Sequence, residues 1–468
     1  MMGARSTAAT FVGVGILLSV IGCSTPETSS QDIAPEPTSS ADLVPSQRPE
    51  RLQPLAIIVH PSRGTLRLDL TTARRVIAGN VSEWSQLGQR GRTLHIVSNG
   101  SADRRVAAVA HDADALSVVP ASRVNPRVQV ALVSGIDPLA EPARYPILSA
   151  GASAPTPITV TVVGDIMMAR GVADAMGDDT LAPLRPVAAQ LRSADLTIGN
   201  LESSLSQDGQ ATQGTDSFGA DPEVLDALER AGFDVLSLAN NHVGDYGGDA
   251  LQQTLDTFQG SSIDSVGAGS TLRRARRPSV TSVGGIRIGV LAFNSIGESP
   301  AARAASPGVV QVRMPPRTGP LNDDDLNALT SRIERLKGRA DIVLVIPHWG
   351  DQYTRTPLDV QRRVAAQLVR AGATAVVGSH PHWVQGMEMV GSSVVAYSLG
   401  NFIFDMDFSE PTMQGIAVNL TFWGDRLMAA TPVPVSIAPN FSAHFVGDRR
   451  GAEILNDVWG NSYGSLTN

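Results

Sequence analysis

The sequence predicts an α/β fold in which buried strands alternate with helices. Between residues 158 and 405, apolar runs are continuous rather than alternating, which is typical of strands buried on both faces. Segments that begin with Asp or Pro and end in Gly separate these runs, as helices do. Most runs end in a polar cluster, and in open α/β sheets binding sites form beyond the carboxyl ends of the strands.

The composition is that of an ordinary globular protein of two or three domains. The chain has 468 residues, of which 42% are hydrophobic and 18% are charged, and its formal net charge is −8. Proteins that bind nucleic acid normally carry a basic face. The charge therefore argues against a nucleic-acid partner.

The first 53 residues are expected to lie outside the folded part. Residues 11–20 form an apolar stretch of the length of a signal-peptide core, and Cys23, the only cysteine, follows it. This arrangement resembles a bacterial lipoprotein signal over residues 1–23, with cleavage before Cys23 and lipid on its sulfur. The alternatives are a plain secretory signal and an N-terminal membrane anchor. Residues 24–53 are rich in Ser, Thr and Pro and predict a disordered tether, so we expect an extracytoplasmic protein that is lipid-anchored to the bacterial cell membrane.

Residues 54–149 predict a small α/β domain. Residues 68–88, LDLTTARRVIAGNVSEWSQLG, resemble a segment of the phosphate-type periplasmic solute-binding fold, in which the equivalents of Ile77 and Trp84 pack inward. The segment is too short for a complete two-lobed binding protein and has no glycine-rich anion nest at a helix start. We therefore expect a packing or docking module, with solute binding as the alternative.

The main domain is expected to span residues 157–405. Two helices stand out within it, over 221–232 and 356–372, and the first begins with Asp221 as N-cap and Pro222 at the first helical position. Residues 406–468 predict a hairpin and a short closing helix that complete the domain.

Carboxylate, amide and imidazole side chains, all of which can bind a metal, gather at the predicted strand ends. They are Asp165, Asn200, Glu202, Asn240, Asn241, His242, Asp245, Asn294, His348, His380, His382, Asn401 and Asp405. Neutral imidazole and carboxylate together suit a divalent metal such as Zn, Mn or Fe. Pro381 disfavours helical geometry at His380, and in an extended segment His380 and His382 would point the same way and clasp one metal, or one each of a pair.

Each of these residues also has a structural explanation. Asp165 could cap a helix, Asn240 and Asn241 could form a plain turn, and His348 could be a packed, satisfied histidine. Their joint occurrence at equivalent strand ends favours a metal site.

Six segments in order resemble the poly-γ-glutamate capsule-synthesis protein family (CapA). They read GDIMMARG, GNLESSL, ANNHVGDYG, PHWGDQY, GSHPHWVQG and YSLGNFIFD. This family is similar to calcineurin-type metallophosphoesterases, which implies a β-sandwich flanked by helices. The metal ligands that the resemblance implies are Asp165, Glu202, Asn241, His348, His380 and His382. Met167 stands where that superfamily has a further His ligand, so either one metal or two metals of unequal affinity are expected.

The resemblance also implies that His242 is the general acid. The positions of other residues in the sequence suggest further roles around the metal. Asn240 or His242 would stabilise charge on the attacked group, and Asp245 would orient His242 or serve as a turn residue. Arg170 would bind an anionic substrate or form a surface ion pair. Tyr397, Asn401 and Asp405 would line the rim or support the ligands from behind, the second being favoured.

Two functions are consistent with this pattern. One is a cell-surface metal-dependent hydrolase or transferase in poly-γ-glutamate synthesis, with an anionic polymer or phosphoester as substrate. The other is a non-catalytic, membrane-anchored subunit that assists a membrane synthase in polymer synthesis or export. The four histidines favour the first, and Met167 favours the second.

Overall fold

The computed structural model describes residues 51–91, 93–447 and 449–466, and these described residues belong to one compact unit. The predicted signal, Cys23 and almost all of the predicted tether lie outside the described residues. The first strand begins at Leu52, two residues before the predicted start of the small α/β domain at residue 54. Within the described part of the chain, no helix combines the length and apolarity that crossing a bilayer requires.

The first sheet lies within residues 52–150 and has the order β3-β4-β1-β5, with β7 also paired to β1. Its elements are β1 (Leu52–Val59), α1 (Leu70–Ile77), β3 (His95–Ile96), α2 (Ala102–Val109), β4 (Ala115–Pro120), β5 (Gln129–Val130) and β7 (Leu148–Ala150), and the separate short strands β2 (Arg67–Leu68) and β6 (Leu132–Val133) pair with each other. Trp84 is fully buried, as expected, beneath the guanidinium of Arg63. Ile77 is 36% exposed, so its predicted inward packing is wrong: α1 buries Ala73 and Val76, and Ile77 lies on its outer face.

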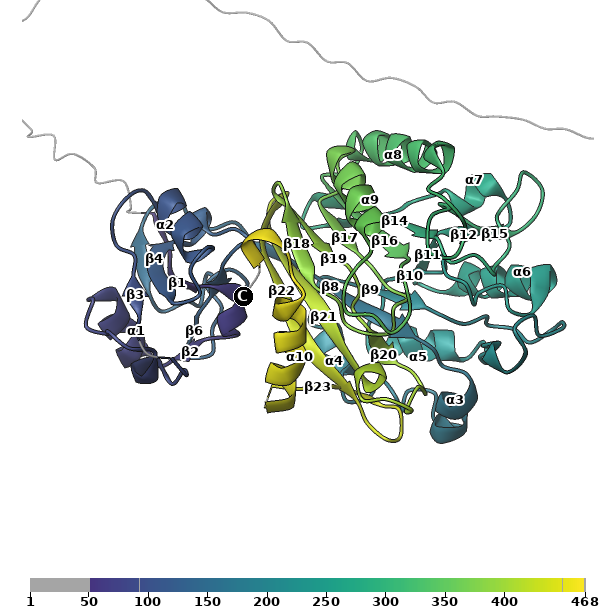
Figure 1. Ribbon diagram of the computed structural model, residues 1–468, viewed down its shortest axis with the longest axis horizontal. Helices are drawn as coiled ribbons and strands as arrows, with labels where there is room; N and C mark the ends of the chain where they lie inside the picture. The colour runs from purple at the N-terminus through teal and green to yellow at the C-terminus, as the bar shows by residue number, and fades with distance from the viewer. Residues whose placement is uncertain (1–50, 92, 448, 467–468) are drawn as a thin grey trace, which may run out of the picture. The chain divides into compact units, whose positions relative to one another are not determined.

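Two larger sheets form the main part of the chain (Figure 1). The eight-stranded sheet has the order β11-β10-β9-β8-β21-β22-β23, with β20 also paired to β8, and consists of β8 (Pro157–Ile166), β9 (Leu196–Leu201), β10 (Val235–Ser237), β11 (Asp264–Val266), β20 (Asn401–Ile403), β21 (Gln414–Trp423), β22 (Arg426–Ile437) and β23 (Ala443–Phe445). The six-stranded sheet has the order β13-β14-β16-β17-β19-β18 and consists of β13 (Ser279–Val283), β14 (Ile286–Asn294), β16 (Ile342–His348), β17 (Ala375–Val377), β18 (Met387–Val390) and β19 (Ser393–Ala396).

Parallel pairing places the strand ends that carry the polar clusters at common edges. Strands β8, β9, β10 and β11 run parallel, and so do β14, β16, β17 and β19. In this register Asp165 pairs with Asn200, and His348 pairs with Asn294. The carboxyl ends of each parallel set therefore meet at one edge of its sheet.

The two large sheets pack face to face. Val160 and Ile198 of the eight-stranded sheet share one buried cluster with Val290 and Leu344 of the six-stranded sheet. Ile454, Val458 and Trp459 of α10 (Arg449–Gly460) join the same cluster and close it at one side. Apolar burial of this kind supplies most of the driving force for folding.

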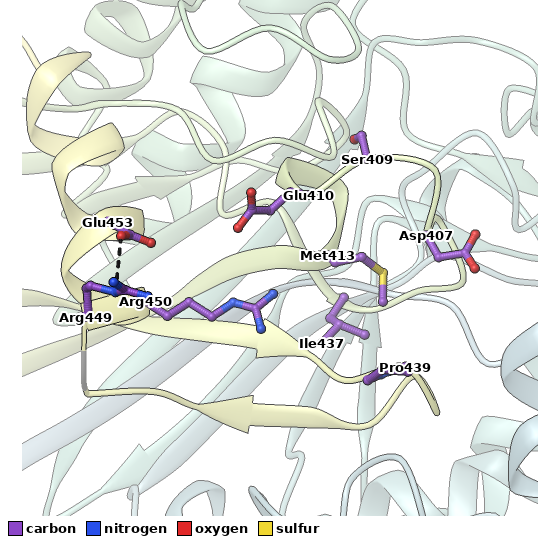
Figure 2. A pocket seen from close by; sticks show the side chains of 9 residues that line it. All are labelled: Asp407, Ser409, Glu410, Met413, Ile437, Pro439, Arg449, Arg450 and Glu453. Carbon is purple, nitrogen blue, oxygen red and sulfur yellow. Dashed lines mark ion pairs between the residues drawn. The ribbon is translucent and has the colours of Figure 1, made fainter.

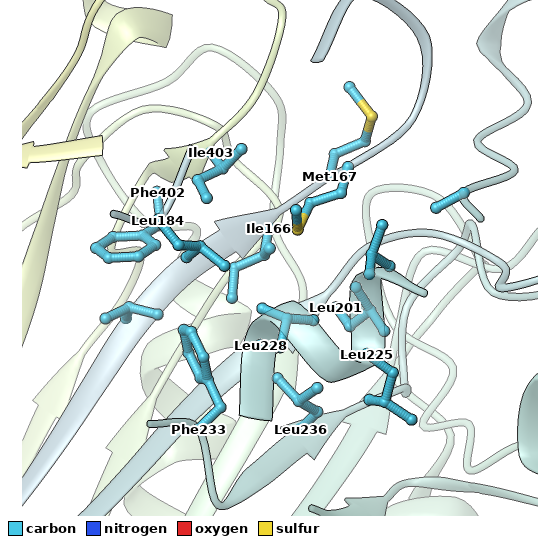
Figure 3. Close-up of a cluster of buried hydrophobic side chains, with 14 of the residues drawn as sticks. Ile166, Met167, Leu184, Leu201, Leu225, Leu228, Phe233, Leu236, Phe402 and Ile403 are labelled. Atoms are coloured by element: carbon cyan, nitrogen blue, oxygen red, sulfur yellow. The ribbon is translucent and has the colours of Figure 1, made fainter. Parts of the chain in front are cut away.

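Helices cover the outer faces of both sheets. The eight-stranded sheet carries α3 (Arg170–Met176), α4 (Ala188–Leu191), α5 (Val224–Ala231) and α6 (Gly247–Thr257), and the six-stranded sheet carries α8 (Asp323–Lys337) and α9 (Asp359–Arg370). Figure 3 shows Leu225 and Leu228 of α5 beside Leu201 and Leu236 of the sheet. The predicted fold class is confirmed: a β-sandwich flanked by helices, preceded by a small α/β part.

The helix α5 begins two residues later than predicted. The Asp221 carboxylate accepts a hydrogen bond from the Glu223 backbone N–H at 2.8 Å, which makes a turn of residues 221–223 rather than a first helical turn. The predicted glycine ends are present, because Gly232 and Gly372 have φ values of 104° and 113°.

The β21–β22 hairpin contacts the first sheet. The indole N–H of Trp423 donates to the Leu139 carbonyl at 2.8 Å, and Trp423 shares a buried cluster with Ile58 and Val119. The small α/β part therefore packs on the hairpin that the C-terminal residues form.

Candidate metal centre

Five of the six predicted ligands come from the carboxyl ends of two pairs of parallel strands, β8 with β9 in one sheet and β16 with β17 in the other. Asp165 is the penultimate residue of β8, Glu202 follows β9, His348 ends β16, and His380 and His382 lie in the turn after β17. All five side chains are at most 1% exposed. The strand register explains why residues from distant parts of the sequence meet here.

The side chains converge on Glu202. Its Oε1 lies 3.5 Å from Nε2 of His348 and 4.0 Å from Nε2 of His382, while Oδ2 of Asp165 lies 3.7 Å from Nδ1 of His382. Two overlapping sets have ligand atoms within 4.8 Å of one another: Glu202, His380 and His382, and Asp165, Glu202 and His348. These groups could hold one divalent cation or two.

Three polar atoms at this centre have no hydrogen-bond partner among the described residues. They are Oε1 of Glu202 and both ring nitrogens of His380, and all three are buried. Buried polar atoms almost always have a partner, because leaving one unpaired costs roughly 1–3 kcal/mol. Carboxylate oxygen and imidazole nitrogen are ligands of Zn, Mn and Fe, so the unpaired atoms fit a divalent cation.

Burial sets the charge of the centre. It raises the pKa of Glu202 well above its ordinary value, and the neighbouring Asp165 carboxylate raises it further. Burial, and then the nearby imidazoles, lower the pKa values of His348 and His380 well below 6.5. The imidazoles are therefore neutral with lone pairs available, and a cation would offset the repulsion between the carboxylates.

Asn401 orients one imidazole from behind. Its Oδ1 lies 2.9 Å from Nδ1 of His382, which leaves Nε2 of that ring facing Glu202, and such contacts fix ring orientation at metal sites. Asn241, the sixth predicted ligand, reaches the centre itself: its Oδ1 lies 2.7 Å from Nε2 of His348, and its amide donates to Glu298 at 2.8 Å.

A histidine–aspartate pair lies beside the ligands. Nδ1 of His242 is 2.8 Å from Oδ2 of Asp245, and its Nε2 is 4.0 Å from Oε1 of Glu202. The His242 ring stacks on Phe218 with centroids 3.8 Å apart. The imidazole is therefore held from one edge and one face, with Nε2 directed toward the centre.

The segment that contains this centre matches a known family. Residues 159–406 match the bacterial capsule synthesis protein family PGA_cap. The chain belongs to the PGA_cap family. The matched segment contains all the predicted ligands, and the family resemblance that the six motifs predicted is confirmed.

Relatives of this PGA_cap chain have related names. It is 34% identical over 260 residues to the capsule biosynthesis protein CapA of Bacillus anthracis, covering 54% of this chain and 61% of that protein. It is 30% identical over 295 residues to a probable polyglutamine synthesis accessory protein of Mycobacterium tuberculosis, and the match covers 54% of this chain and 76% of that protein. The match thus spans about three fifths of the length of the Bacillus protein.

Two solved structures resemble parts of the PGA_cap chain. A phosphatase from Mycoplasma pneumoniae matches 60% of this chain and 94% of its own at 14% identity, with a TM-score of 0.39. A phosphate transport receptor from Vibrio cholerae matches 20% and 53% at 16% identity, with a TM-score of 0.19. The family assignment rests on the sequence match.

The turn that carries His380 and His382 is not extended as predicted. Their φ values are 97° and 58°, in the left-handed region that favours glycine. The backbone N–H of His380 donates to Oδ2 of Asp165 at 3.1 Å, and the Pro381 carbonyl accepts from the Tyr353 N–H at 2.9 Å. These tertiary contacts hold the strained turn, and both imidazoles still reach the candidate metal centre.

Asn240 lies outside the chemistry that we predicted for it. Its amide group donates to the Leu201 carbonyl at 2.7 Å and to Asn200 at 3.2 Å, and its oxygen accepts the N–H groups of His242 and Val243. Both ends of the side chain shape the turn, and no hydrogen is left for a substrate.

Tyr397 also lies elsewhere, whereas Arg170 and Asp405 form a unit. The Tyr397 hydroxyl donates to Glu388 at 2.6 Å, away from the ligands. Arg170 binds both oxygens of Asp405 through two guanidinium nitrogens, and its guanidinium carbon lies 4.3 Å from the Phe218 ring centroid. Asp405 therefore holds Arg170 against the Phe218 ring, which also stacks on His242. Its carboxylate does not support a metal ligand, contrary to the prediction.

Met167 is buried where the resemblance implies a histidine. It is 0% exposed, and its sulfur accepts the Ala169 N–H at 3.1 Å. The PGA_cap centre of this chain therefore gains no nitrogen ligand from β8.

Four residues at the site were given no role from sequence, although Asn200 was named among the polar residues at the strand ends. Asn200 donates to Oδ1 of Asp165 at 2.8 Å, Glu298 contacts Asn241, Phe218 stacks on His242, and the Tyr353 ring lies 6.1 Å from that of His382. Asn200 had a signal, because it ends a strand. The other three lie in loops whose paths no local pattern indicates.

A separate cavity of about 600 Å³ lies near the C-terminal strands. Figure 2 shows side chains of both charge signs around it, among them Asp407, Glu410 and Arg449. It contains none of the predicted ligands, so it is not part of the metal centre.

Proposed function

We propose that the chain is a cell-surface, metal-dependent hydrolase or transferase that acts in the synthesis of poly-γ-glutamate, as a capsule or envelope polymer. Membership of the PGA_cap family and the names of the Bacillus and Mycobacterium relatives support the process. The observation that carries the chemistry is the set of three buried, unpaired ligand atoms on Glu202 and His380.

Six residues would hold the metal. They are Asp165, Glu202, Asn241, His348, His380 and His382. A divalent cation at this place supplies Lewis-acid chemistry to a phosphoryl or carbonyl group. The ligands themselves hold the cation in a buried site, where electrostatic interactions are stronger than in water.

His242 would move the proton. Asp245 accepts from Nδ1, which keeps that nitrogen protonated and directs Nε2 inward. A proton on Nε2 would pass to the oxygen or nitrogen of the leaving group. Arg170, fixed by Asp405 and 28% exposed at its side chain, would contact an anionic part of the substrate.

A non-catalytic role is the second proposal. Met167 fills a ligand position with a buried thioether, and the Mycobacterium relative is named an accessory protein. In this case the chain would be a membrane-anchored subunit that assists a synthase in polymer synthesis or export.

Metal analysis of the purified chain tests the site. We expect at least one divalent metal per chain, lost in H380A/H382A and kept in the control H95A/H111A, whose two histidines lie outside the centre. Equal metal content in both variants would refute the assignment of these ligands.

Turnover separates the two functions. We expect the metal-loaded chain to hydrolyse a generic phosphoester or a γ-glutamyl peptide with added Mn²⁺, and H242A to lose this activity. Bound metal without turnover on either substrate would favour the accessory role.

Membrane attachment is tested at Cys23. We propose that lipid on this residue anchors the protein, so C23A is expected to move from the membrane fraction to the soluble extracytoplasmic fraction. Unchanged membrane association of C23A would argue for an anchor of another kind.

A further inference from the structure

A cavity of about 910 Å³ lies between α7 (Leu272–Ala275) and α8, on the outer side of the six-stranded sheet. Five arginines line it: Arg273, Arg276, Arg332, Arg335 and Arg339. The lining contains no Asp and no Glu. In a chain with a net charge of −8, this local excess of positive charge is unusual.

The five guanidinium groups have no carboxylate partner in the described part of the chain. Arginines nearby do have one: Arg287 pairs with Asp341 at 3.1 Å, and Arg313 pairs with Asp325 at 2.8 Å. Within the cavity, Arg332 donates to the Arg276 backbone carbonyl. Five arginines therefore line a hollow without an acidic partner among the described residues, and only the Arg332 guanidinium donates to a backbone carbonyl there.

The arrangement is electrostatically unfavourable by itself. Burial lowers the pKa of Arg332 to about 10, and the positive charges of Arg276 and Arg335 contribute to the shift. Like charges in a partly desolvated place repel one another, and a bound anion would remove that repulsion.

The floor of the cavity is apolar. Leu272, Leu291, Leu336 and Pro278 lie among the arginines. A polymer that carries carboxylates on methylene groups, as a glutamate polymer does, could place its carbons on this floor and its carboxylates on the guanidinium groups. A polyphosphate has no carbon to bury there.

A second cavity of about 870 Å³ adjoins this one and shares Pro278 and Arg339 with it. Its lining adds Arg274 and Arg277 but also Asp256 and Asp264, so the excess of positive charge is concentrated in the five-arginine cavity. The volume of the five-arginine cavity, about 910 Å³, is near the upper end of the range for a single small ligand, roughly 300–1,000 Å³. A cavity of this size suits several units of an extended ligand.

We propose that the five-arginine cavity binds a polycarboxylate chain at a site separate from the metal centre. Arg339 precedes β16 and His348 is its last residue, and a seven-residue strand is roughly 23 Å long. The chain would thus be gripped at the opposite end of β16 from the ligands. This binding requires no turnover.

Fluorescence anisotropy with labelled poly-L-glutamate tests the proposal on the whole chain. The test variant is R273Q/R276Q/R335Q, which changes three exposed arginines and leaves the half-buried Arg332 in place. The control R67Q/R74Q/R104Q removes the same charge from exposed arginines that form no ion pair with the described residues. Thermal unfolding of both variants checks that each is folded.

We expect the test variant to weaken the Kd for poly-L-glutamate at least tenfold, which corresponds to about 1.4 kcal/mol, and the control to weaken it less than twofold. H380A/H382A should bind as tightly as the unchanged chain, which distinguishes this site from the metal centre. Equal weakening in test and control variants, loss of binding in H380A/H382A, or binding of only orthophosphate, polyphosphate or anionic vesicles would each overturn the proposal.

Discussion

Nδ1 of His242 lies 2.8 Å from Oδ2 of Asp245, so the carboxylate fixes which imidazole nitrogen faces the metal centre. The same oxygen accepts the Phe218 N–H at 2.7 Å, which ties the ring that stacks on His242 to the carboxylate that orients it. One aspartate thus positions the imidazole from its edge and, through Phe218, from its face.

Changing Asp245 should impair turnover without releasing metal. D245N keeps an oxygen for the Phe218 N–H but weakens the hold on the His242 ring, so we expect turnover to fall about 10²-fold, within the range typical of general acid–base catalysis. Steady-state kinetics and metal analysis measure the two effects, and D249N, an exposed aspartate on α6, is the control. Loss of metal in D245N would contradict this role.

Arg170 should affect substrate affinity more than turnover. Its guanidinium is held by Asp405 beside Phe218, and we expect R170Q to raise KM for an anionic substrate about tenfold, equivalent to about 1.4 kcal/mol. R185Q, which removes an exposed arginine paired with Asp179, should leave KM unchanged. A fall in kcat with constant KM in R170Q would place Arg170 in the chemical step instead.

Gly164 should be required for the position of Asp165. A Cβ added at Gly164 would lie 2.0 Å from the Gly400 carbonyl oxygen, so G164A must push β8 and β20 apart. We expect it to lower the free energy of unfolding by about 1–3 kcal/mol and to reduce metal content. Urea unfolding and metal analysis check this, with G260A as the control because nothing lies within 4 Å of an added Cβ there.

His348 and His380 should each contribute a loss of stability in mild acid when the protein is chelated. Burial lowers their pKa values, so both stay neutral in the folded state while the unfolded chain takes up protons below pH 6.5. This contribution lowers the free energy of unfolding by up to about 1.4 kcal/mol per pH unit for each histidine, whereas the raised pKa values of Glu202 and Asp165 act in the opposite direction, so the test compares slopes between variants. Urea unfolding in a chelator between pH 7.5 and 5.5 should show a smaller slope for H380Q than for the unchanged chain. Equal slopes would mean that His380 is protonated in the folded state.

Much of the centre could be predicted from sequence because it depends on strand ends. Asp165, Glu202 and His348 each follow a continuous apolar run, and the carboxyl ends of parallel strands share an edge. That rule needs no knowledge of the loops. It also explains why Asn240, at an equivalent end, was included although its side chain serves the turn.

The remainder depends on contacts between distant loops. Pro381 disfavours the right-handed helical region for His380 but leaves the left-handed region open. His380 adopts the left-handed region, and its N–H donates a hydrogen bond to Asp165 there. Tyr353 and Glu298 reach the site through loops with no periodic pattern. The inward packing of Ile77 failed for a similar reason, since a helix end can face solvent.

Positive φ angles at non-glycine residues gather around the metal centre. Arg170, Glu298, Tyr353, His380 and His382 all have them, between 48° and 97°. A side chain in this region costs roughly 1–2 kcal/mol per residue, a cost that glycine would not incur. Laboratory selection for heat resistance alone should therefore favour glycine at these five positions and yield proteins that are more thermostable but no longer bind metal. Selection that also demands metal retention should keep the present side chains.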